Sequence, residues 1–225
     1  MSIPSLERWR TGPLYTIREA SRLAEVSPQT VQRWISGYEA SRKHMSPVFG
    51  DPIESPLVSF LELAEIVTVS KFRRKKVPLE RVRSAHKIAR AQMGLEYPFA
   101  SLRLEVFVRH IVIVPSESNP WSSLAVLDSP GVWTLPGIVS ELLHQGFEYK
   151  DDLASRWFPL GKGVPIVVDP RYAAGVPTIP DRGVTIATIK DRFKMGQSIK
   201  FIAKDLVLQR DQVEAVIRYA DKIAA

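Results

Sequence analysis

Apolar residues recur at helical spacing near the start of the chain. Ile17, Ala20, Leu23 and Ala24 are three or four positions apart, which places them on one face of a helix. The segment Thr16-Ile-Arg-Glu19 has the spacing of a capping box, in which the Thr and Glu side chains bond free N–H groups at the helix start. We therefore predict a short helix that begins after Thr16 and ends at Ala24.

A second helix is predicted directly after the first. Ser27 is a favourable N-cap, and Pro28 suits the first helical position, where its missing N–H leaves no bond unmade. Val31, Trp34 and Ile35 then form an apolar stripe at i, i+3 and i+4. Two short helices joined by so short a turn are typical of a helix-turn-helix.

Two longer helices complete an N-terminal domain over residues 1–93. Ser59-Phe-Leu-Glu62 is another capping box, and the helix that it begins runs toward a basic cluster at residues 71–76. A further helix is predicted from about Pro78 to Met93. The basic cluster is compatible with contact along DNA and equally with an ordinary exposed helix end.

The pattern changes to a strand-like one in a middle segment, residues 94–168. Residues 102–114 are rich in β-branched side chains and alternate in part, as in strands or a hairpin. Further strands are predicted at residues 132–135 and 163–168, with one short helix at residues 138–144. The order of these strands stays open.

Helical spacing returns in the last segment, residues 169–225, after a loop rich in Gly and Pro. Three helices are predicted, marked by Ile186 to Phe193, Ser198 to Leu206 and Val213 to Ala220. The predicted fold class is therefore α+β. It comprises an N-terminal winged helix-turn-helix helical domain, a short β-rich middle segment and a C-terminal three-helix domain that resembles a second helix-turn-helix.

The composition is that of a folded protein and limits its chemistry. Hydrophobic residues make up 45% and charged residues 24%, and no apolar run approaches the roughly 18–20 residues of a membrane span. The N-terminus lacks the apolar core of a secretory signal, so we expect a cytoplasmic protein without a membrane partner. There is no cysteine, and the four histidines lack metal-ligand spacing. We expect no metal site and no cofactor.

Positive charge is concentrated at one end of the chain. Residues 1–90 hold 16 Lys and Arg against 9 Asp and Glu, whereas residues 91–225 hold 15 of each. The whole net charge of +7 therefore lies in the first 90 residues. Such segregation is expected of a protein that binds phosphates through one module, although a solvated basic face is the alternative.

The second predicted helix carries the side chains suited to base contacts. Gln29, Gln32 and Arg33 face away from its apolar stripe, and amide and guanidinium groups can form paired hydrogen bonds with purines. Arg18 in the first helix is a candidate for a phosphate contact, and a wing after the second helix would supply two more cations. The complete set of predicted DNA-binding residues is Arg18, Ser27, Gln29, Thr30, Gln32, Arg33, Arg42 and Lys43.

Candidates for catalysis are few, and we expect none of them to be catalytic. The carboxylates worth testing are Asp169, Asp181 and the pair Asp151-Asp152, which fits a turn. The chain has no GxxxxGK[ST], GxGxxG or GxSxG motif. An enzyme that uses Asp169 and Asp181 is the last of three hypotheses for function.

Two resemblances to known families lead to the other two hypotheses for function, which are described below. Residues 14–34, LYTIREASRLAEVSPQTVQRW, resemble the MerR-type winged helix-turn-helix, although Glu25 stands where that family often has glycine. The tail from Val167 resembles the domain of unknown function 433, through Val168-Asp-Pro170, Gly175-Val-Pro-Thr-Ile179 and Gly196-Gln-Ser198.

Proteins that join these two domains are similar to VapB-type antitoxins of bacterial toxin–antitoxin modules. This resemblance implies two partners, operator DNA and a PIN-like ribonuclease toxin, and it implies repression of the module's own promoter. A homodimer or a toxin–antitoxin hetero-oligomer is then expected. The toxin-binding residues are not assigned. The alternative hypothesis is a stand-alone MerR-like regulator whose middle segment binds a small effector.

Overall fold

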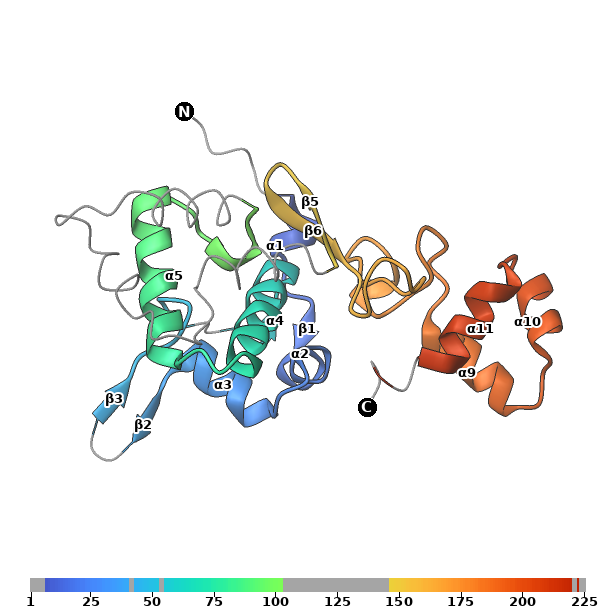
Figure 1. The fold of residues 1–225 in the computed structure, drawn as a ribbon, viewed down its shortest axis with the longest axis horizontal. Coiled ribbons are helices and arrows are strands. Elements are labelled where there is room, and N and C mark those ends of the chain that lie inside the picture. Colours follow the sequence, from blue (N-terminus) through green and yellow to red (C-terminus); the bar gives the residue numbers. More distant parts are fainter. Residues whose placement is uncertain (1–6, 41–42, 53–54, 103–145, 220–221, 223–225) are drawn as a thin grey trace, which may run out of the picture.

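The computed structural model describes the chain except for residues 1–6, 41–42, 53–54, 103–145, 220–221 and 223–225. It has a mixed α+β fold with an N-terminal helix-turn-helix, which confirms the predicted fold class. A C-terminal group of three helices lies at the opposite end of the molecule (Figure 1). The strands predicted at residues 102–114 and 132–135, and the helix predicted at 138–144, lie outside the described residues.

The helix-turn-helix consists of α2, Ile17–Ala24, and α3, Pro28–Ser36. Both predicted N-caps are confirmed. The Thr16 hydroxyl accepts a bond from the backbone N–H of Glu19, whose carboxylate accepts one from the Thr16 N–H in return. The Ser27 hydroxyl likewise accepts a bond from the backbone of the first turn of α3. These caps fix where each helix begins, independently of the rest of the fold.

The turn between α2 and α3 is held in place by a third helix, α4, Phe60–Arg74. Glu25 adopts a left-handed conformation (φ 53°), which usually favours glycine. The Ser70 hydroxyl and the Arg74 guanidinium both donate to the carbonyl of Ala24, at 2.6 and 3.0 Å. Arg74 also pairs with the Glu25 carboxylate at 2.9 Å. These contacts compensate the strained turn.

A two-stranded hairpin follows the helix-turn-helix. Strands β2, Tyr38–Ala40, and β3, Lys43–Met45, pair antiparallel and project from the body of the molecule beside α3 (Figure 1). A hairpin at this place is the wing that the sequence predicted after the second helix. A second small sheet pairs β1, Tyr15–Thr16, with β4, Leu57–Val58, and ties the start of α2 to the start of α4.

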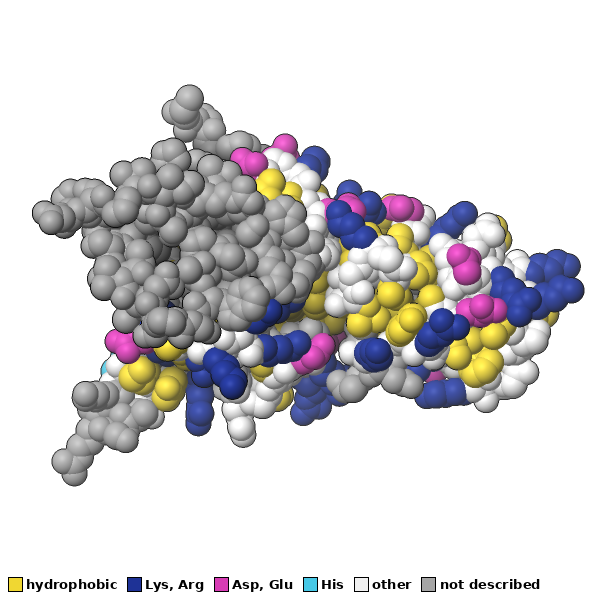
Figure 2. Space-filling model, viewed as in Figure 1, with side chains coloured by type: hydrophobic (Ala, Val, Ile, Leu, Met, Phe, Trp, Pro, Cys, Tyr) yellow, Lys and Arg dark blue, Asp and Glu magenta, His cyan; other side chains and the backbone are white. Residues whose placement is uncertain are grey.

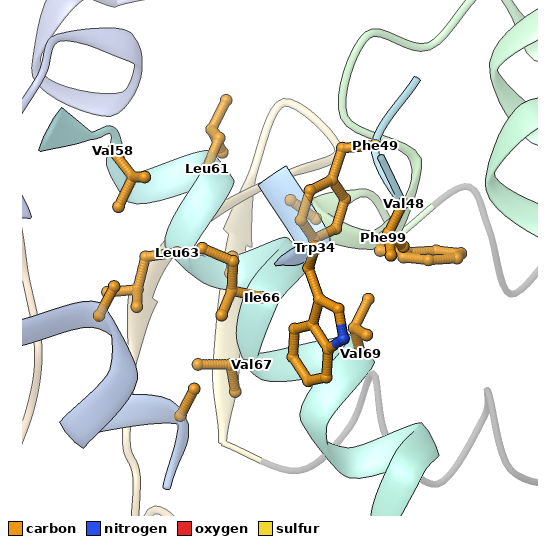
Figure 3. Close-up of a cluster of buried hydrophobic side chains, with 14 of the residues drawn as sticks. Trp34, Val48, Phe49, Val58, Leu61, Leu63, Ile66, Val67, Val69 and Phe99 are labelled. Atoms are coloured by element: carbon orange, nitrogen blue, oxygen red, sulfur yellow. The ribbon is translucent and has the colours of Figure 1, made fainter. Parts of the chain in front are cut away.

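Helix α4 is the centre of the N-terminal core. Most of its side chains are buried, and α5, Leu79–Met93, and η1, Pro98–Ala100, pack against it. Figure 3 shows apolar side chains of α4 together with Trp34 of α3 and the aromatic rings of Phe49 and Phe99. The orientation of helix α3 is therefore set by packing against a nearly fully buried helix.

The described part of the middle segment packs on this N-terminal core. Strands β5, Phe147–Lys150, and β6, Leu153–Trp157, form a hairpin, and Phe147 and Trp157 belong to the same buried cluster as α4. Asp151 and Asp152 form its turn with φ of 52° and 63°, which confirms the turn prediction for this pair. Of the strand predicted at residues 163–168, only isolated bridges at its last two residues are present.

A short first helix, α1, Arg8–Thr11, secures that hairpin. The guanidinium of Arg10, almost fully buried, donates to the carbonyl of Lys150 at 2.8 Å. The Lys150 ammonium in turn pairs with Glu7 at 2.7 Å. Residues at the two ends of the N-terminal unit, which runs from α1 to the β5–β6 hairpin, thus bond directly across 140 and 143 positions.

The C-terminal unit has its own core. Its elements are η2, Ala173–Gly175, α9, Ile186–Lys194, α10, Ile199–Asp205, and α11, Arg210–Tyr219. Buried residues from all three α-helices, from the turn before α11 and from the preceding loop gather there: Ile166, Ile179, Ile186, Ile189, Ile202, Ala203, Leu208, Val213 and Val216. The three helices predicted in this segment are confirmed.

The two units meet at a small seam. Leu23 of α2 is half-buried and packs against both hydrophobic clusters. The buried Tyr15 hydroxyl donates to the carbonyl of Gly175 at 3.1 Å. Gly175 has φ of 72°, and a Cβ there would lie 2.1 Å from that hydroxyl oxygen, so only glycine fits. Burial, with a smaller effect of the Asp169 charge, raises the pKa of Tyr15, which keeps its hydroxyl a donor.

Candidate nucleic-acid interface

Helix α3 has one buried face and one polar, exposed face. Val31, Trp34 and Ile35 are buried against the core, as the apolar stripe predicted. Gln29, Gln32 and Arg33 are exposed on the opposite side. In a helix-turn-helix, this outward face of the second helix is the one that enters the major groove.

Among the other predicted residues, Ser27 and Thr30 have a structural task at the start of α3. Their hydroxyl oxygens lie 2.8 Å apart, and the Ser27 hydroxyl also caps the backbone N–H of Thr30. Gln32 donates from its amide to the Ser36 hydroxyl at 2.8 Å. These bonds order the polar face, and the carbonyl oxygen of the Gln32 amide makes no bond within the described residues.

Arg33 connects α3 to the wing. Its guanidinium carbon lies 5.2 Å from the ring centre of Tyr38, the first residue of β2, within the range of a cation–π contact. The N–H groups of the Arg33 guanidinium have no hydrogen-bond acceptor in the described part of the chain, so they stay available for a base. An aromatic platform of this kind reduces the rotamer freedom that Arg33 would lose on binding a base. Tyr38 was not among the predicted residues.

The three remaining predicted residues surround this face. Arg18 is exposed on α2. Lys43 begins strand β3, and its backbone pairs with Ala40 in the wing. Arg42 lies outside the described residues. In the space-filling view, Lys and Arg side chains project along the lower edge of the molecule, where α2 and α3 lie (Figure 2). No finding tests the contacts that these side chains make, so the DNA-binding set stays a prediction.

The basic cluster at residues 71–76 has mixed surroundings in the structure. Lys71 is half-buried, and its ammonium lies 5.6 Å from the ring centre of Phe147. Burial, together with the nearby Arg74 charge, lowers the pKa of Lys71 to about 8. Arg73 donates to the carbonyl of Val77. Much of this cluster therefore supports the fold. Its residue Arg74 also pairs with Glu25 in the turn between α2 and α3.

The C-terminal unit contains the same supersecondary motif. Helices α10 and α11 are joined by a turn in which Val207 is left-handed (φ 55°), as Glu25 is in the first motif. Asp211 and Glu214 lie exposed or half-buried on α11, and Glu214 pairs with Arg210 at 2.7 Å. This second motif presents acidic side chains on the helix that corresponds to α3.

The carboxylates considered for catalysis are paired with arginines. The carboxylate of the buried Asp169 accepts two bonds from the Arg171 guanidinium, at 2.9 and 2.6 Å. Asp181 pairs with Arg156 at 3.1 Å. Within the described ranges, no group of three or more His, Cys, Asp or Glu could hold a metal ion. Both aspartates thus have a structural role as partners of arginines, Asp169 of Arg171 and Asp181 of Arg156.

Two family models match separate parts of the chain. Residues 13–86 match a family model described as "Putative DNA-binding HTH domain", and residues 166–220 match one described as "Protein of unknown function (DUF433)". The chain therefore carries a helix-turn-helix domain and a DUF433 domain. The MerR resemblance is not confirmed by these matches. None of the helices in the described ranges is long and apolar enough to cross a membrane.

Relatives align along nearly the whole chain. It is 29% identical over 231 residues to "Putative antitoxin VapB45" of Mycobacterium tuberculosis, with 95% of each protein covered. It is 27% identical over 215 residues to "Uncharacterized protein Rv2308" of the same organism, covering 93% of this chain and 90% of that protein. The crystal structure of Rv2018 from Mycobacterium tuberculosis shares the fold, with a TM-score of 0.65, 24% identity and coverage of 91% and 97%.

Proposed function

We propose that this protein is the antitoxin of a type II toxin–antitoxin module and represses its own operon. In this role the N-terminal unit binds operator DNA in the cytoplasm, and a second surface binds and neutralises a PIN-like ribonuclease. The observation that carries the proposal is an exposed, amide- and guanidinium-bearing face on α3 with a wing beside it. The similarity, over 95% of each chain, to a relative named "Putative antitoxin VapB45" supports the toxin-binding half.

The DNA-binding half follows from the geometry of the exposed face. Gln29, Gln32 and Arg33 lie within five residues of one helix and share its outward side. Paired amide and guanidinium contacts distinguish purines in the major groove. The wing places Tyr38 beside Arg33, where it can hold the guanidinium ready for a base. The surplus of Lys and Arg in residues 1–90 supplies the attraction for phosphates.

The toxin-binding half can be tested by coexpression with the product of the adjacent gene. The expected result is copurification of the two proteins and relief of the growth arrest that the adjacent product causes alone. A gel shift with the DNA upstream of the operon is expected to show binding by the antitoxin and by the complex. Two-fold symmetry of operators makes a dimeric arrangement the expected one.

Separate outcomes would overturn the two halves. An adjacent product that neither copurifies nor arrests growth removes the antitoxin role. If a small molecule then changes the affinity of the protein for upstream DNA, the stand-alone regulator becomes the better hypothesis. A protein without affinity for upstream DNA at low salt removes the repressor role. Nuclease activity of the isolated chain that Asp169→Asn abolishes would restore the enzyme hypothesis.

A further inference from the structure

The C-terminal unit exposes apolar side chains at the place where α9 turns into α10. Met195 is 78% exposed, Phe201 53% and Phe193 43%. In the rest of the described chain, large apolar side chains with comparable exposure are Val207, at the next turn, and Tyr172 and Val176, at less than two fifths. Isolated exposed apolar residues are normal, but three within nine residues at one corner form a group.

The sequence pattern emphasises how unusual this exposure is. Phe193 continues the apolar stripe of α9 after Ile186 and Ile189, which are both buried. The stripe thus runs past the end of the core and out to the surface. Phe201 lies off the buried face of α10, next to Ile202, and has no internal packing to explain it. Burial inside this chain does not account for either ring.

Lysines surround the same corner. Lys194, Lys200 and Lys204 are exposed, and none of them forms an ion pair with another described residue. Lys200 and Lys204 are four positions apart, so they share one side of α10. Figure 2 shows Lys and Arg side chains together with apolar ones at the end of the molecule where α9 and α10 lie. We define the α9–α10 corner as Phe193, Lys194, Met195, Lys200, Phe201 and Lys204.

The ion pair between Arg192 and Asp205 holds the corner together. It joins the last turn of α9 to the last turn of α10. Phe193 follows Arg192 directly, and Phe201 lies one helical turn before Asp205 on the same side of α10. The corner is therefore a preformed surface rather than a set of independent side chains, and binding to it costs little ordering of the backbone.

We propose that the α9–α10 corner docks an acidic surface of the proposed toxin. This inference rests on the proposed function and names its second surface. Aromatic and Met side chains are enriched at the centres of protein interfaces, and free lysines around them match a negative rim.

The chemistry of the corner favours a protein over nucleic acid as its occupant. Met195 and Val207, the two most exposed apolar side chains, gain nothing from contact with phosphates. The neighbouring helix α11 presents Asp211 in its first turn, and this carboxylate repels a phosphate backbone. An acidic protein with an apolar centre complements both the lysines and the apolar groups of this corner.

The test uses the full chain and the purified product of the adjacent gene, with binding measured by calorimetry. Phe201→Ser and the double change Lys200→Glu/Lys204→Glu are each expected to weaken binding at least about 30-fold, as for central interface residues. Matched controls are Val176→Ser and Arg182→Glu, which change exposed side chains outside the corner. The controls are expected to bind as the unchanged protein does, and operator affinity is expected to stay the same in all variants.

The outcomes separate this inference from the proposed function. If the unchanged protein does not bind the adjacent product, the antitoxin function fails and the docking surface fails with it. If the corner variants bind it as well as the controls do, the surface is wrong and the antitoxin function stands. If the corner variants lose operator affinity but keep the adjacent product, the corner binds DNA and the inference is overturned. Unchanged thermal unfolding of each variant shows that the fold is intact.

Discussion

The two helix-turn-helix motifs of this chain have almost the same framework. Each has a left-handed residue in its turn, Glu25 in the first and Val207 in the second, with φ of 53° and 55°. Counted from these residues, Val31 corresponds to Val213 and Trp34 to Val216, and all four are buried. The same alternation of buried and outward positions thus builds both motifs.

The outward positions differ in chemistry. By the same count, Gln29 corresponds to Asp211 and Gln32 to Glu214. An amide can donate to and accept from a base edge, whereas a carboxylate only accepts and is repelled by phosphates. The first motif also has a wing with Tyr38. The comparison teaches that the framework does not decide what a helix-turn-helix binds, because its exposed side chains do.

The largest effect is expected from breaking each framework at its core. Trp34→Ala should destabilise the N-terminal core by about 3–5 kcal/mol, and Ile202→Ala the C-terminal core by about 2–5 kcal/mol, since both side chains are buried. All five Trp lie before residue 158, so none belongs to the C-terminal helices, while circular dichroism follows all helices. Ile202→Ala is expected to shift the dichroism transition more than the fluorescence transition. Equal shifts would mean that both cores unfold as one.

The next effect separates the two outward faces. Arg33→Ala is expected to cost roughly 1–3 kcal/mol of specific operator affinity, because its guanidinium is aimed outward beside the wing. The matched control is Glu214→Ala on α11, which should leave that affinity unchanged. The dissociation constants are compared at one fixed salt concentration. Equal affinity of Arg33→Ala and the unchanged protein would remove the base-reading role from this residue.

A smaller effect is expected at the seam between the motifs. Tyr15→Phe removes the bond to the Gly175 carbonyl and leaves that acceptor unsatisfied, which should cost about 0.5–1.5 kcal/mol. Tyr172→Phe, which removes an exposed hydroxyl with no described hydrogen bond, serves as the control. Denaturant unfolding measures both. No difference between the two variants would show that the seam adds nothing to stability.

The smallest effect concerns the shared turn. Val207→Gly is expected to stabilise the protein by up to about 1 kcal/mol, because a β-branched residue is strained at positive φ. Glu25→Gly should gain less, since it also removes the ion pair with Arg74. The midpoint of thermal unfolding is the measurement. Destabilisation by Val207→Gly would mean that the exposed Val207 side chain has a packing role.

Local signals predicted the framework well. The caps at Thr16, Ser27 and Ser59 and the apolar stripes of α2 and α3 depend on near neighbours, and the structure confirms them. The turn at Asp151-Asp152 was recognised for the same reason. What a few adjacent residues determine can be found in the sequence alone.

Distant contacts could not be predicted in this way. The sheet between β1 and β4 has two residues in each strand, too few for an alternation to be seen. The bonds from Ser70 and Arg74 to the turn after Ala24 join positions about fifty residues apart. The platform that Tyr38 gives Arg33 depends on how the wing folds back, which the helical pattern does not contain.

The seam has a consequence for any attempt to divide the protein. A fragment that ends before Gly175 would keep Tyr15 but lose its acceptor, and Leu23 would lose its contact with the second core. Tyr15 lies just before α2 and Leu23 lies within it, and α2 is the first helix of the helix-turn-helix. Removing the C-terminal unit would thus expose the Leu23 side chain and the Tyr15 hydroxyl to water beside the helix-turn-helix. An isolated N-terminal fragment would therefore be less stable than the same part of the whole chain, and a DNA affinity measured on it would be too low.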